Sequence, residues 1–246
     1  MKRFKLNLIW LLIIFLVIIV GCRKNNNPTT VENVEPGKIP LFVPKMVQLP
    51  VALENKNDSA AKQTVTYIKT IDVAFDFRHF FVPVNNPDTS GQVVTWTVDS
   101  ILVTIMATEN DTGYQWVVVL NGTSDSRGIV YNDFLLMEME QNSDGTAGKY
   151  AIHNLWTNSD DLLAESRWLT LQDGATYFET ILYNDGRKVN RIEIVSNLDH
   201  SGNLKYYIYK DGSSDLLRFK AEWYIDGSGQ CWIYDEMMNI SFEGAW

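Results

Sequence analysis

Short runs of apolar and aromatic residues alternate with polar turn sequences from Val93 to the C-terminus. The turns recur at intervals of roughly ten residues and combine Asp, Asn or Ser with Gly, as hairpin turns do. These residue types tolerate the backbone dihedral angles that tight turns need. The pattern therefore predicts ten or eleven antiparallel strands over residues 93–246, arranged as an up-and-down meander.

Residues 57–82 carry a pattern that fits a helix or a strand. The sequence Asn-Asp-Ser at 57–59 can cap a helix, and the alanines that follow favour one. Apolar residues then recur at spacings of four and three, which form one helical stripe, although part of the segment also alternates as a strand does. We predict a helix that ends before Pro83, followed by a loop over residues 83–92. The stripe consists of Ala61, Val65, Ile68, Ile71 and Phe75, and the alternating set of Val65, Tyr67, Ile71, Val73, Phe75 and Phe77.

The strand predicted over residues 216–225 has one apolar face and one charged face, whereas the aromatic residues of 204–209 fall on both faces. A sheet that needs cover on both sides must curl, stack on another layer or accept a helix. We therefore predict a mainly β fold, in which a curved or barrel-like sheet has the 57–82 helix packed on it or in it. The apolar face of 216–225 consists of Leu217, Phe219, Ala221, Trp223 and Ile225, and the charged face of Arg218, Lys220 and Glu222.

The hairpin around residues 184–186 allows a prediction of strand register. A three-residue loop sets Glu179 opposite Arg191, and a two-residue loop at 185–186 sets Glu179 opposite Ile192. The first pairing places unlike charges opposite each other, so we favour it.

Aromatic residues are the most suggestive candidates for a binding site. In the last long hairpin the predicted register sets Trp223 opposite Trp232, a pair that would contribute about 1 kcal/mol beyond its buried area. We interpret most of the tryptophans as core residues, because bulky side chains favour strands. Trp223, Trp232 and Tyr207 are candidates to line a ligand cavity or to stack on sugars.

The N-terminus has a different pattern. Lys2, Arg3 and Lys5 precede an unbroken apolar run over residues 8–20, and the chain turns polar after Cys22. The run is shorter than the roughly 20 apolar residues that a membrane-spanning helix requires. This layout is typical of a secretory signal peptide.

The sequence Ile19-Val20-Gly21-Cys22 resembles the lipobox of bacterial lipoproteins. In that family the leader is removed before the cysteine, which then carries the acyl chains. The resemblance implies a signal peptide over residues 1–21 and a lipidated Cys22, and two or more acyl chains hold a protein stably on a membrane. Arg23 is not the aspartate that retains lipoproteins at the inner membrane. In a bacterium with two membranes, the resemblance therefore implies the outer membrane, with the protein facing the periplasm.

We interpret residues 22–50 as a lipidated cysteine and an Asn- and Pro-rich tether, since proline every few residues prevents helix and ladder hydrogen bonds. The apolar residues within 39–43 suggest that the distal part of the tether lies against the body. Residues 51–246 are predicted to form one β-rich domain. The prolines of the tether are Pro28, Pro36, Pro40, Pro44 and Pro50.

The chain of 246 residues has a net charge of −9. Three of its 21 Lys and Arg residues and none of its 30 Asp and Glu residues lie in residues 1–21, which leaves 18 basic and 30 acidic residues, a net charge of −12, in the remainder. Such an acidic body repels phosphate backbones, so we expect no nucleic acid partner. It is also repelled by anionic lipid headgroups, which suits a body attached to the membrane through its N-terminal lipid.

The chain holds two cysteines and three histidines. With Cys22 lipidated, Cys231 has no disulfide partner, and we expect it to be a small buried residue. One cysteine and three scattered histidines do not make a zinc site, and we expect no cofactor. Residues 197–202 resemble the start of an EF-hand loop, but the twelfth position is Ile208 rather than an acid, so we interpret them as a hairpin turn.

Motifs for catalysis are weak. The sequence contains no Gly-x-Ser-x-Gly, which disfavours a serine hydrolase. Glu138 and Glu140 share a predicted strand face, and Glu179 and Glu193 lie on neighbouring strands, so a carboxylate-dependent hydrolase is an alternative. Glutamates on a solvated strand face are the ordinary case, and we expect that the protein is not an enzyme.

The predicted order of one early helix and many antiparallel strands resembles the open-barrel carriers of the lipoprotein-sorting system, in element order alone. We expect a non-enzymatic, lipid-anchored envelope protein that binds an apolar ligand or an envelope protein. The alternatives are a carbohydrate-binding or surface-assembly component that uses exposed aromatics, and a carboxylate-dependent hydrolase. A closed apolar cavity would favour the first function, an exposed aromatic platform the second, and two convergent buried carboxylates the third.

Overall fold

A computed structural model describes Phe42 and residues 44–71, 88–90, 93–98, 100–125, 128–157, 159–210 and 214–246. The chain divides between Pro36 and Gly37 into two compact units, and every described residue belongs to the second unit. The predicted signal peptide, Cys22 and residues 23–41 of the predicted tether lie outside the described residues.

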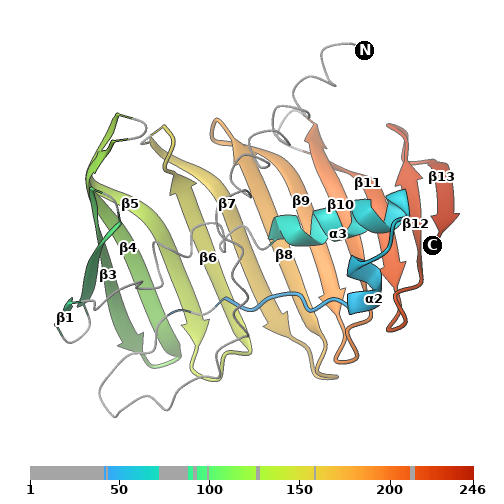
Figure 1. The fold of residues 1–246 in the computed structure, drawn as a ribbon, viewed down its shortest axis with the longest axis horizontal. Helices are drawn as coiled ribbons and strands as arrows, with labels where there is room; N and C mark the ends of the chain where they lie inside the picture. The colour runs from blue at the N-terminus through green and yellow to red at the C-terminus, as the bar shows by residue number, and fades with distance from the viewer. Residues whose placement is uncertain are drawn as a thin grey trace. The chain divides into compact units, whose positions relative to one another are not determined.

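In the described part of the chain, the body is one antiparallel sheet of thirteen strands, and every strand pairs with the next one along the chain (Figure 1). The sheet is curved, and β1 and β13 are its two edges. The mainly β, up-and-down fold expected from the sequence is confirmed. The strand count is higher than expected, and β1 lies within the predicted loop over residues 83–92. The strands are β1 Asp88–Ser90, β2 Val93–Val98, β3 Ile101–Asn110, β4 Gly113–Ser124, β5 Ile129–Asn142, β6 Ala147–Asn154, β7 Ser159–Thr170, β8 Thr176–Asn184, β9 Arg187–Ser196, β10 Gly202–Lys210, β11 Ser214–Trp223, β12 Gly229–Tyr234 and β13 Ile240–Ala245.

The segment with the mixed pattern forms a helix, α3 (Ser59–Ile71), which lies across one face of the sheet near β8, β9, β10 and β12 (Figure 1). Asp58 caps this helix, because its Oδ1 accepts a hydrogen bond of 2.7 Å from the backbone N–H of Ala60. Residues 72–82 of the predicted helix lie outside the described residues. Neither α3 nor the short α2 (Val51–Glu54), the helices in the described part of the chain, has the length and apolar character needed to cross a membrane. The helix α3 buries Ala61, Thr64, Ile68 and Ile71.

The sheet face on which α3 lies, which we call the covered face, holds the hydrophobic core. Phe42 packs into this core and is 1% exposed. Its ring centroid lies 5.4 Å from that of Trp116, 6.0 Å from that of Trp168 and 6.2 Å from that of Tyr150. The packed body therefore begins before residue 51, the predicted start of the domain.

Three tryptophans pack over glycines of a neighbouring strand in the same way. Trp223 of β11 lies opposite Gly202 of β10, and a Cβ added to Gly202 would lie 2.5 Å from the Trp223 ring. The Trp223 indole Nε1 donates a hydrogen bond of 2.8 Å to the carbonyl of His200, a turn residue with a φ of 67°. Glycine leaves room for the ring, and the turn carbonyl accepts from an indole N–H that would otherwise be buried without a partner. The other two sets are Trp168 with Gly148 and the Gly145 carbonyl, and Trp246 with Gly229 and the Gly227 carbonyl.

The turns before these glycines share an arrangement that we call the aspartate clasp. In the β9–β10 turn, Asp199 Oδ1 accepts hydrogen bonds from the backbone N–H and the hydroxyl of Ser201, at 3.0 and 2.6 Å. These bonds lower the pKa of Asp199 and hold the turn closed. The hairpin turn therefore accounts for Asp199, the acidic residue of 197–202. The same clasp joins Asp144 to Thr146 and Asp226 to Ser228.

The predicted register of the β8–β9 hairpin is wrong. Residues 185–186 form a two-residue turn with φ angles of 49° and 70°, as a type I′ turn requires. A bulge after Leu182 then sets Glu179 opposite Glu193 rather than opposite Arg191. The extra residue in the bulge shifts the register in a way that neither predicted loop length allows.

The predicted pairing of Trp223 with Trp232 is also wrong. Trp223 lies opposite Gly229, and Trp232 lies opposite Lys220. The turn occupies residues 224–228, closed by a hydrogen bond of 2.9 Å from the backbone N–H of the first to the carbonyl of the last. This longer turn places the two tryptophans on opposite faces of the sheet.

Candidate functional site

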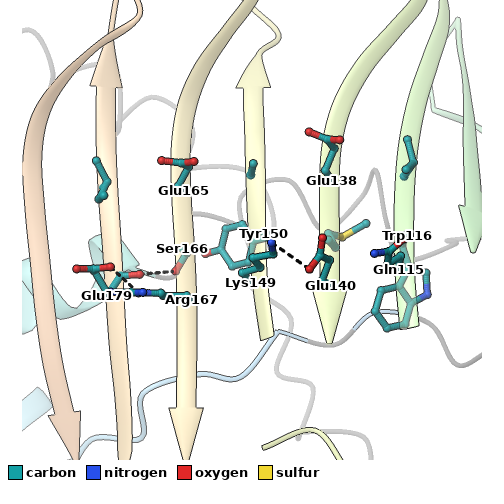
Figure 2. A pocket seen from close by; sticks show the side chains of 14 residues that line it. Gln115, Trp116, Glu138, Glu140, Lys149, Tyr150, Glu165, Ser166, Arg167 and Glu179 are labelled. Atoms are coloured by element: carbon teal, nitrogen blue, oxygen red, sulfur yellow. Dashed lines mark hydrogen bonds and ion pairs between the residues drawn. The ribbon is translucent and has the colours of Figure 1, made fainter. Parts of the chain in front are cut away.

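The sheet face opposite α3, which we call the open face, carries many charged side chains. Burial alternates along the strands: Trp116 and Tyr150 are buried on the covered face, whereas their neighbours Gln115 and Lys149 are exposed. Successive side chains of a strand point to opposite faces, so the exposed set shares one surface. Figure 2 shows part of this surface, with the labelled glutamates carried by neighbouring antiparallel strands.

One row of mostly charged residues crosses the open face from β4 to β13, and we call it the charged row. Each member lies opposite the next member on the adjacent strand, so neighbours are about one strand spacing, ~4.8 Å, apart. Lys149 lies beside Arg167, and Glu179 lies beside Glu193. Opposite charges flank each of these like-charged pairs on both sides. The charged row consists of Gln115, Glu140, Lys149, Arg167, Glu179, Glu193, Lys205, Lys220, Trp232 and Glu243.

A hollow of about 580 Å³ lies on the open face over β4 to β8 (Figure 2). Its volume falls in the range of small-ligand sites, but charged side chains line it where apolar ones are more usual. A second hollow of about 340 Å³ shares several lining residues with the first, so the two adjoin and we call them together the groove. The charged residues of the first hollow are Glu138, Glu140, Lys149, Glu165, Arg167 and Glu179.

Glu179 is the most enclosed carboxylate of the groove, with its side chain 11% exposed. The Arg167 Nε lies 2.6 Å from its Oε2, and the Arg191 Nη1 lies 3.7 Å from its Oε1. Burial, and then the negative charges of Glu179 and Glu193, raise the pKa of the neighbouring Tyr177 to about 12. The positive charges of Arg167 and Arg191 therefore offset the repulsion between Glu179 and Glu193, which lie opposite each other.

Arg191 connects the groove to the aromatic part of the open face. Its guanidinium forms ion pairs with Glu193, at 3.1 Å, and with Asp215. It also lies over the ring of Tyr207, 4.2 Å from the ring centroid. The Tyr207 hydroxyl donates a hydrogen bond of 3.1 Å to Glu193, and burial followed by the Glu193 charge raises the pKa of Tyr207 to about 12.

A second row of the open face places two glutamates around a small residue. Glu138 of β5 and Glu165 of β7 both lie opposite Ala151 of β6. Their Cα atoms are therefore about two strand spacings, ~9.6 Å, apart, and the alanine leaves the space between them open (Figure 2). The hydroxyl of Tyr183 donates a hydrogen bond to Glu165. Burial, followed by this hydrogen bond, raises the pKa of Tyr183.

His153 lies beside Glu138. Its Nδ1 donates a hydrogen bond of 2.9 Å to the carbonyl of Asp160, and its Nε2 lies 3.6 Å from the Glu138 carboxylate, too far for a hydrogen bond. The hydrogen bond of His153 therefore joins β6 to the start of β7.

The groove offers hydrogen-bond acceptors and donors close to one another. Glu138, Glu140 and Glu165 supply acceptor oxygens, and Lys149 and Arg167 supply donors. In the described part of the chain, no group of three or more His, Cys, Asp or Glu side chains is placed to hold a metal ion. The arrangement is suited to a ligand with many hydroxyl groups, because a hydroxyl both donates and accepts.

The residues expected to line a cavity lie on different faces. Trp223 is buried on the covered face and is 1% exposed. Tyr207 and Trp232 lie on the open face, where Trp232 packs under the Lys220 ammonium, 4.5 Å from its ring centroid. Cys22 lies outside the described residues, and Cys231 is buried as expected.

From the sequence, Glu138, Glu140, Glu179 and Glu193 are candidate carboxylates, and Arg191 is the predicted neighbour of Glu179. Lys149 and Arg167 are ordinary strand-face cations in the sequence, and only the pairing of β5 to β8 brings them beside the glutamates. The sequence feature that could have indicated these cations is the alternation of charged and apolar residues in their strands, which places the charged residues on one face.

No family model matches the chain, and a comparison with curated proteins finds no similar sequence.

Proposed function

We propose that this protein is a non-enzymatic, lipid-anchored protein of the bacterial cell envelope whose open face binds carbohydrate. The sequence Ile19-Val20-Gly21-Cys22 supports the anchor. The groove over β4 to β8 supports the binding site. Its charged lining favours a polar ligand over the apolar ligand expected first from the sequence.

The close neighbourhood of acceptors and donors in the groove is the observation that carries the proposal. Sugar hydroxyls are arranged at short intervals and each one donates and accepts, so they match carboxylates that lie beside ammonium and guanidinium groups. The first hollow holds four glutamates and two cations. This excess of negative charge favours a neutral glycan over an anionic one.

Aromatic rings beside the groove support the same ligand class. Tyr177 adjoins Arg167, and Tyr207 packs against Arg191 on the same face. The apolar face of a sugar ring packs on such rings, and tyrosine combines this surface with a hydroxyl that hydrogen-bonds. These tyrosines are half-buried, and together with the groove they support the carbohydrate alternative.

The carboxylates of the groove are suited to hold a ligand rather than to transfer a proton. Glu179 is engaged by Arg167 and Arg191, and Glu165 accepts a hydrogen bond from Tyr183. This supports a binding function without catalysis.

The experiment is a glycan array that displays neutral and anionic polysaccharide fragments of bacterial envelopes, probed with the full-length protein purified in detergent. The test variant is Ala151→Trp, which fills the space between Glu138 and Glu165. The matched control is Leu198→Trp, in a turn residue that is 77% exposed.

We expect wild type and Leu198→Trp to bind neutral glycans and Ala151→Trp to lose at least tenfold in affinity while keeping its melting temperature. Absence of binding to every glycan, or binding that Ala151→Trp leaves unchanged, would contradict the proposal.

A further inference from the structure

Exposed apolar side chains gather at one end of the sheet. Because each strand runs antiparallel to the next, the turns that follow odd-numbered strands all lie at this end, the lower one in Figure 1. Leu198 of the β9–β10 turn is 77% exposed, and Ile225 of the β11–β12 turn is 62% exposed. Val51 of α2 is 70% exposed. The helix adjoins the β11–β12 turn, because a Cβ added to Gly227 would lie 2.6 Å from the backbone nitrogen of Leu53. We call Val51, Leu198 and Ile225 the apolar tip.

The turns do not need apolar residues at these positions. Four of the described turns share two backbone hydrogen bonds, from the N–H of the first residue to the carbonyl of the fifth and from the N–H of the fourth to the carbonyl of the first. The second residue of each turn is exposed, and it is polar in two turns and apolar in the two that contribute to the apolar tip. An apolar side chain is therefore not required to form the turn. The four second residues are Gln172, Leu198, Ile225 and Glu236.

The N-terminal part of the chain joins the body at the same end. The Lys45 ammonium donates a hydrogen bond of 2.7 Å to the hydroxyl of Thr170, the last residue of β7. From there the chain runs to α2 beside the β11–β12 turn (Figure 1). Phe42, the first described residue, follows Cys22 by twenty residues, which span at most about 70 Å. A lipid on Cys22 therefore holds this end of the sheet close to the bilayer.

We propose that the apolar tip inserts into the surface of the phospholipid bilayer that holds the lipid of Cys22. This inference rests on the lipid anchor of the proposed function. Leu198 and Ile225 lie on turns about two strand spacings, ~9.6 Å, apart, so they project as separate side chains that fit between lipid headgroups. Apolar side chains bury at the boundary of headgroups and acyl chains, and binding strength increases with the apolar area buried. The sheet then stands on its turns, with the open face clear of the lipid.

Three side chains bind a bilayer weakly on their own, and the anchor makes this weak contact sufficient. A tethered site binds as if its partner were present at a concentration on the order of millimolar. The apolar tip therefore orients a body that the acyl chains already hold at the membrane.

Carboxylates beside the apolar tip favour a zwitterionic lipid surface over an anionic one. Asp199 follows Leu198, and Asp226 follows Ile225. Hydrogen bonds from the side chain and the backbone of the clasp serine lower the pKa of each aspartate, so both stay charged at neutral pH. Anionic headgroups repel these charges. We therefore expect a contact that is insensitive to salt on phosphatidylcholine and weaker when phosphatidylglycerol is added.

The test uses an environment-sensitive fluorophore on Leu198→Cys in the full-length, acylated protein, reconstituted into phosphatidylcholine liposomes that contain a spin-labelled quencher lipid. Cys231 is buried, so the label attaches at the introduced cysteine. The matched control is Glu236→Cys, at the same position of the β12–β13 turn, which lies at the opposite end of the sheet. We expect a blue-shifted emission and at least threefold stronger quenching for the label at Leu198→Cys.

A second variant tests the rest of the apolar tip. Val51→Ser combined with Ile225→Ser removes two largely exposed side chains, so the melting temperature is expected to stay the same. Quenching of the label at Leu198→Cys is expected to fall at least twofold. The matched control is Val130→Ser, which removes a side chain that is 61% exposed near the opposite end of the sheet. This control is expected to leave the quenching unchanged.

Flotation of the liposomes separates failure of the anchor from failure of the tip contact. Protein that does not float with the liposomes would show that the anchor and the contact that rests on it are both wrong. Protein that floats, with equal quenching at Leu198→Cys and Glu236→Cys, would keep the anchor and overturn the contact. A blue shift at Leu198→Cys in native membranes but not in liposomes would indicate a protein partner and would also overturn it.

Discussion

Trp223 of β11 covers Gly202 of β10, and its indole nitrogen donates to the carbonyl of His200 at 2.8 Å. A Cβ at Gly202 would lie 2.5 Å from the Trp223 ring and 2.3 Å from the backbone oxygen of Val195. Neither the ring nor the strand backbone has space to move away. The tryptophan, the glycine and the turn therefore form one unit, repeated three times in the sheet.

We predict that Gly202→Ala lowers the free energy of unfolding by about 3 kcal/mol, because overpacking of a filled core costs ~1–3 kcal/mol and strand backbone is displaced here as well. Urea denaturation followed by tryptophan fluorescence measures the change. The matched control is Gly128→Ala, where the added Cβ meets nothing within 4 Å and the cost is that of a φ of 66°, about 1 kcal/mol. Equal losses in the two variants would show that the ring does not depend on the glycine.

Arg191 is predicted to stabilise the open face through Glu179, Glu193 and Asp215. Arg191→Met leaves Glu179 and Glu193 opposite each other without one of their cations. Removing one partner of a buried ion pair costs ~3–5 kcal/mol, and the partial exposure of this group reduces the expected loss to about 2 kcal/mol.

Lys149→Met is the control for this loss. Lys149 pairs with Glu140 at 3.0 Å, but both side chains are more exposed, so the expected loss is below ~1 kcal/mol. Urea midpoints measured at low and high salt check both values. A loss for Arg191→Met no larger than that for Lys149→Met would mean that the arginine does not offset the carboxylate pair.

Tyr177 and Tyr207 make the fold sensitive to alkali. Both have pKa values raised from 10 to about 12. In the unfolded chain these hydroxyls ionise near pH 10, so their contribution to stability is complete below pH 10 and is lost as the pH rises towards 12. We expect the free energy of unfolding to fall over this range and Tyr207→Phe to make the fall shallower. Absorbance of tyrosinate and urea midpoints measure the two effects, and a flat profile in wild type would contradict the assignment.

The approximate number of strands, the two faces of each strand and the helix could be predicted from the sequence. Turn residues and side-chain periodicity depend only on residues that are close together in the chain. Register could not be predicted, because one bulge residue shifts every later pair and the packing that selects a bulge is distant in sequence. A bulge at Arg218 has this effect in β11, where Phe219 lies opposite Tyr206 and Leu217 lies opposite Tyr207. Leu217 was expected on the apolar face with Phe219, and the bulge moves it to the open face.

Part of the candidate site could be predicted from the sequence, because some of its residues are recognisable within their own strands. Glu138, Glu140, Glu179 and Glu193 of the open face could be selected as strand-face carboxylates from their own strands. Arg167 is recognised as a partner of Glu179 only when β7 and β8 are aligned, and Arg191 reaches Glu179 from a register other than the predicted one. Trp223 was selected for its size alone, which does not distinguish a core ring from one that faces a ligand.

The lipid anchor gives a prediction that does not depend on the body. Cys22→Ser removes the only thiol of the lipobox sequence, so we expect the variant to appear in the soluble fraction with an unchanged circular dichroism spectrum. Labelling with radioactive palmitate should mark wild type and not the variant. Retention of Cys22→Ser in the membrane pellet would show that attachment does not depend on acylation.

The binding of carbohydrate to the open face is tested most directly by the side-chain NMR signals of two arginines during titration with a neutral glycan selected on the array. Arg167 lines the groove, with its Nε–H directed at Glu179, whereas Arg187 lies at the exposed start of β9. Saturable movement of the Arg167 Nε–H signal, with the Arg187 signal unchanged, is the predicted result. A glycan that binds while the Arg167 signal stays in place would contradict the assignment of the groove as the binding site.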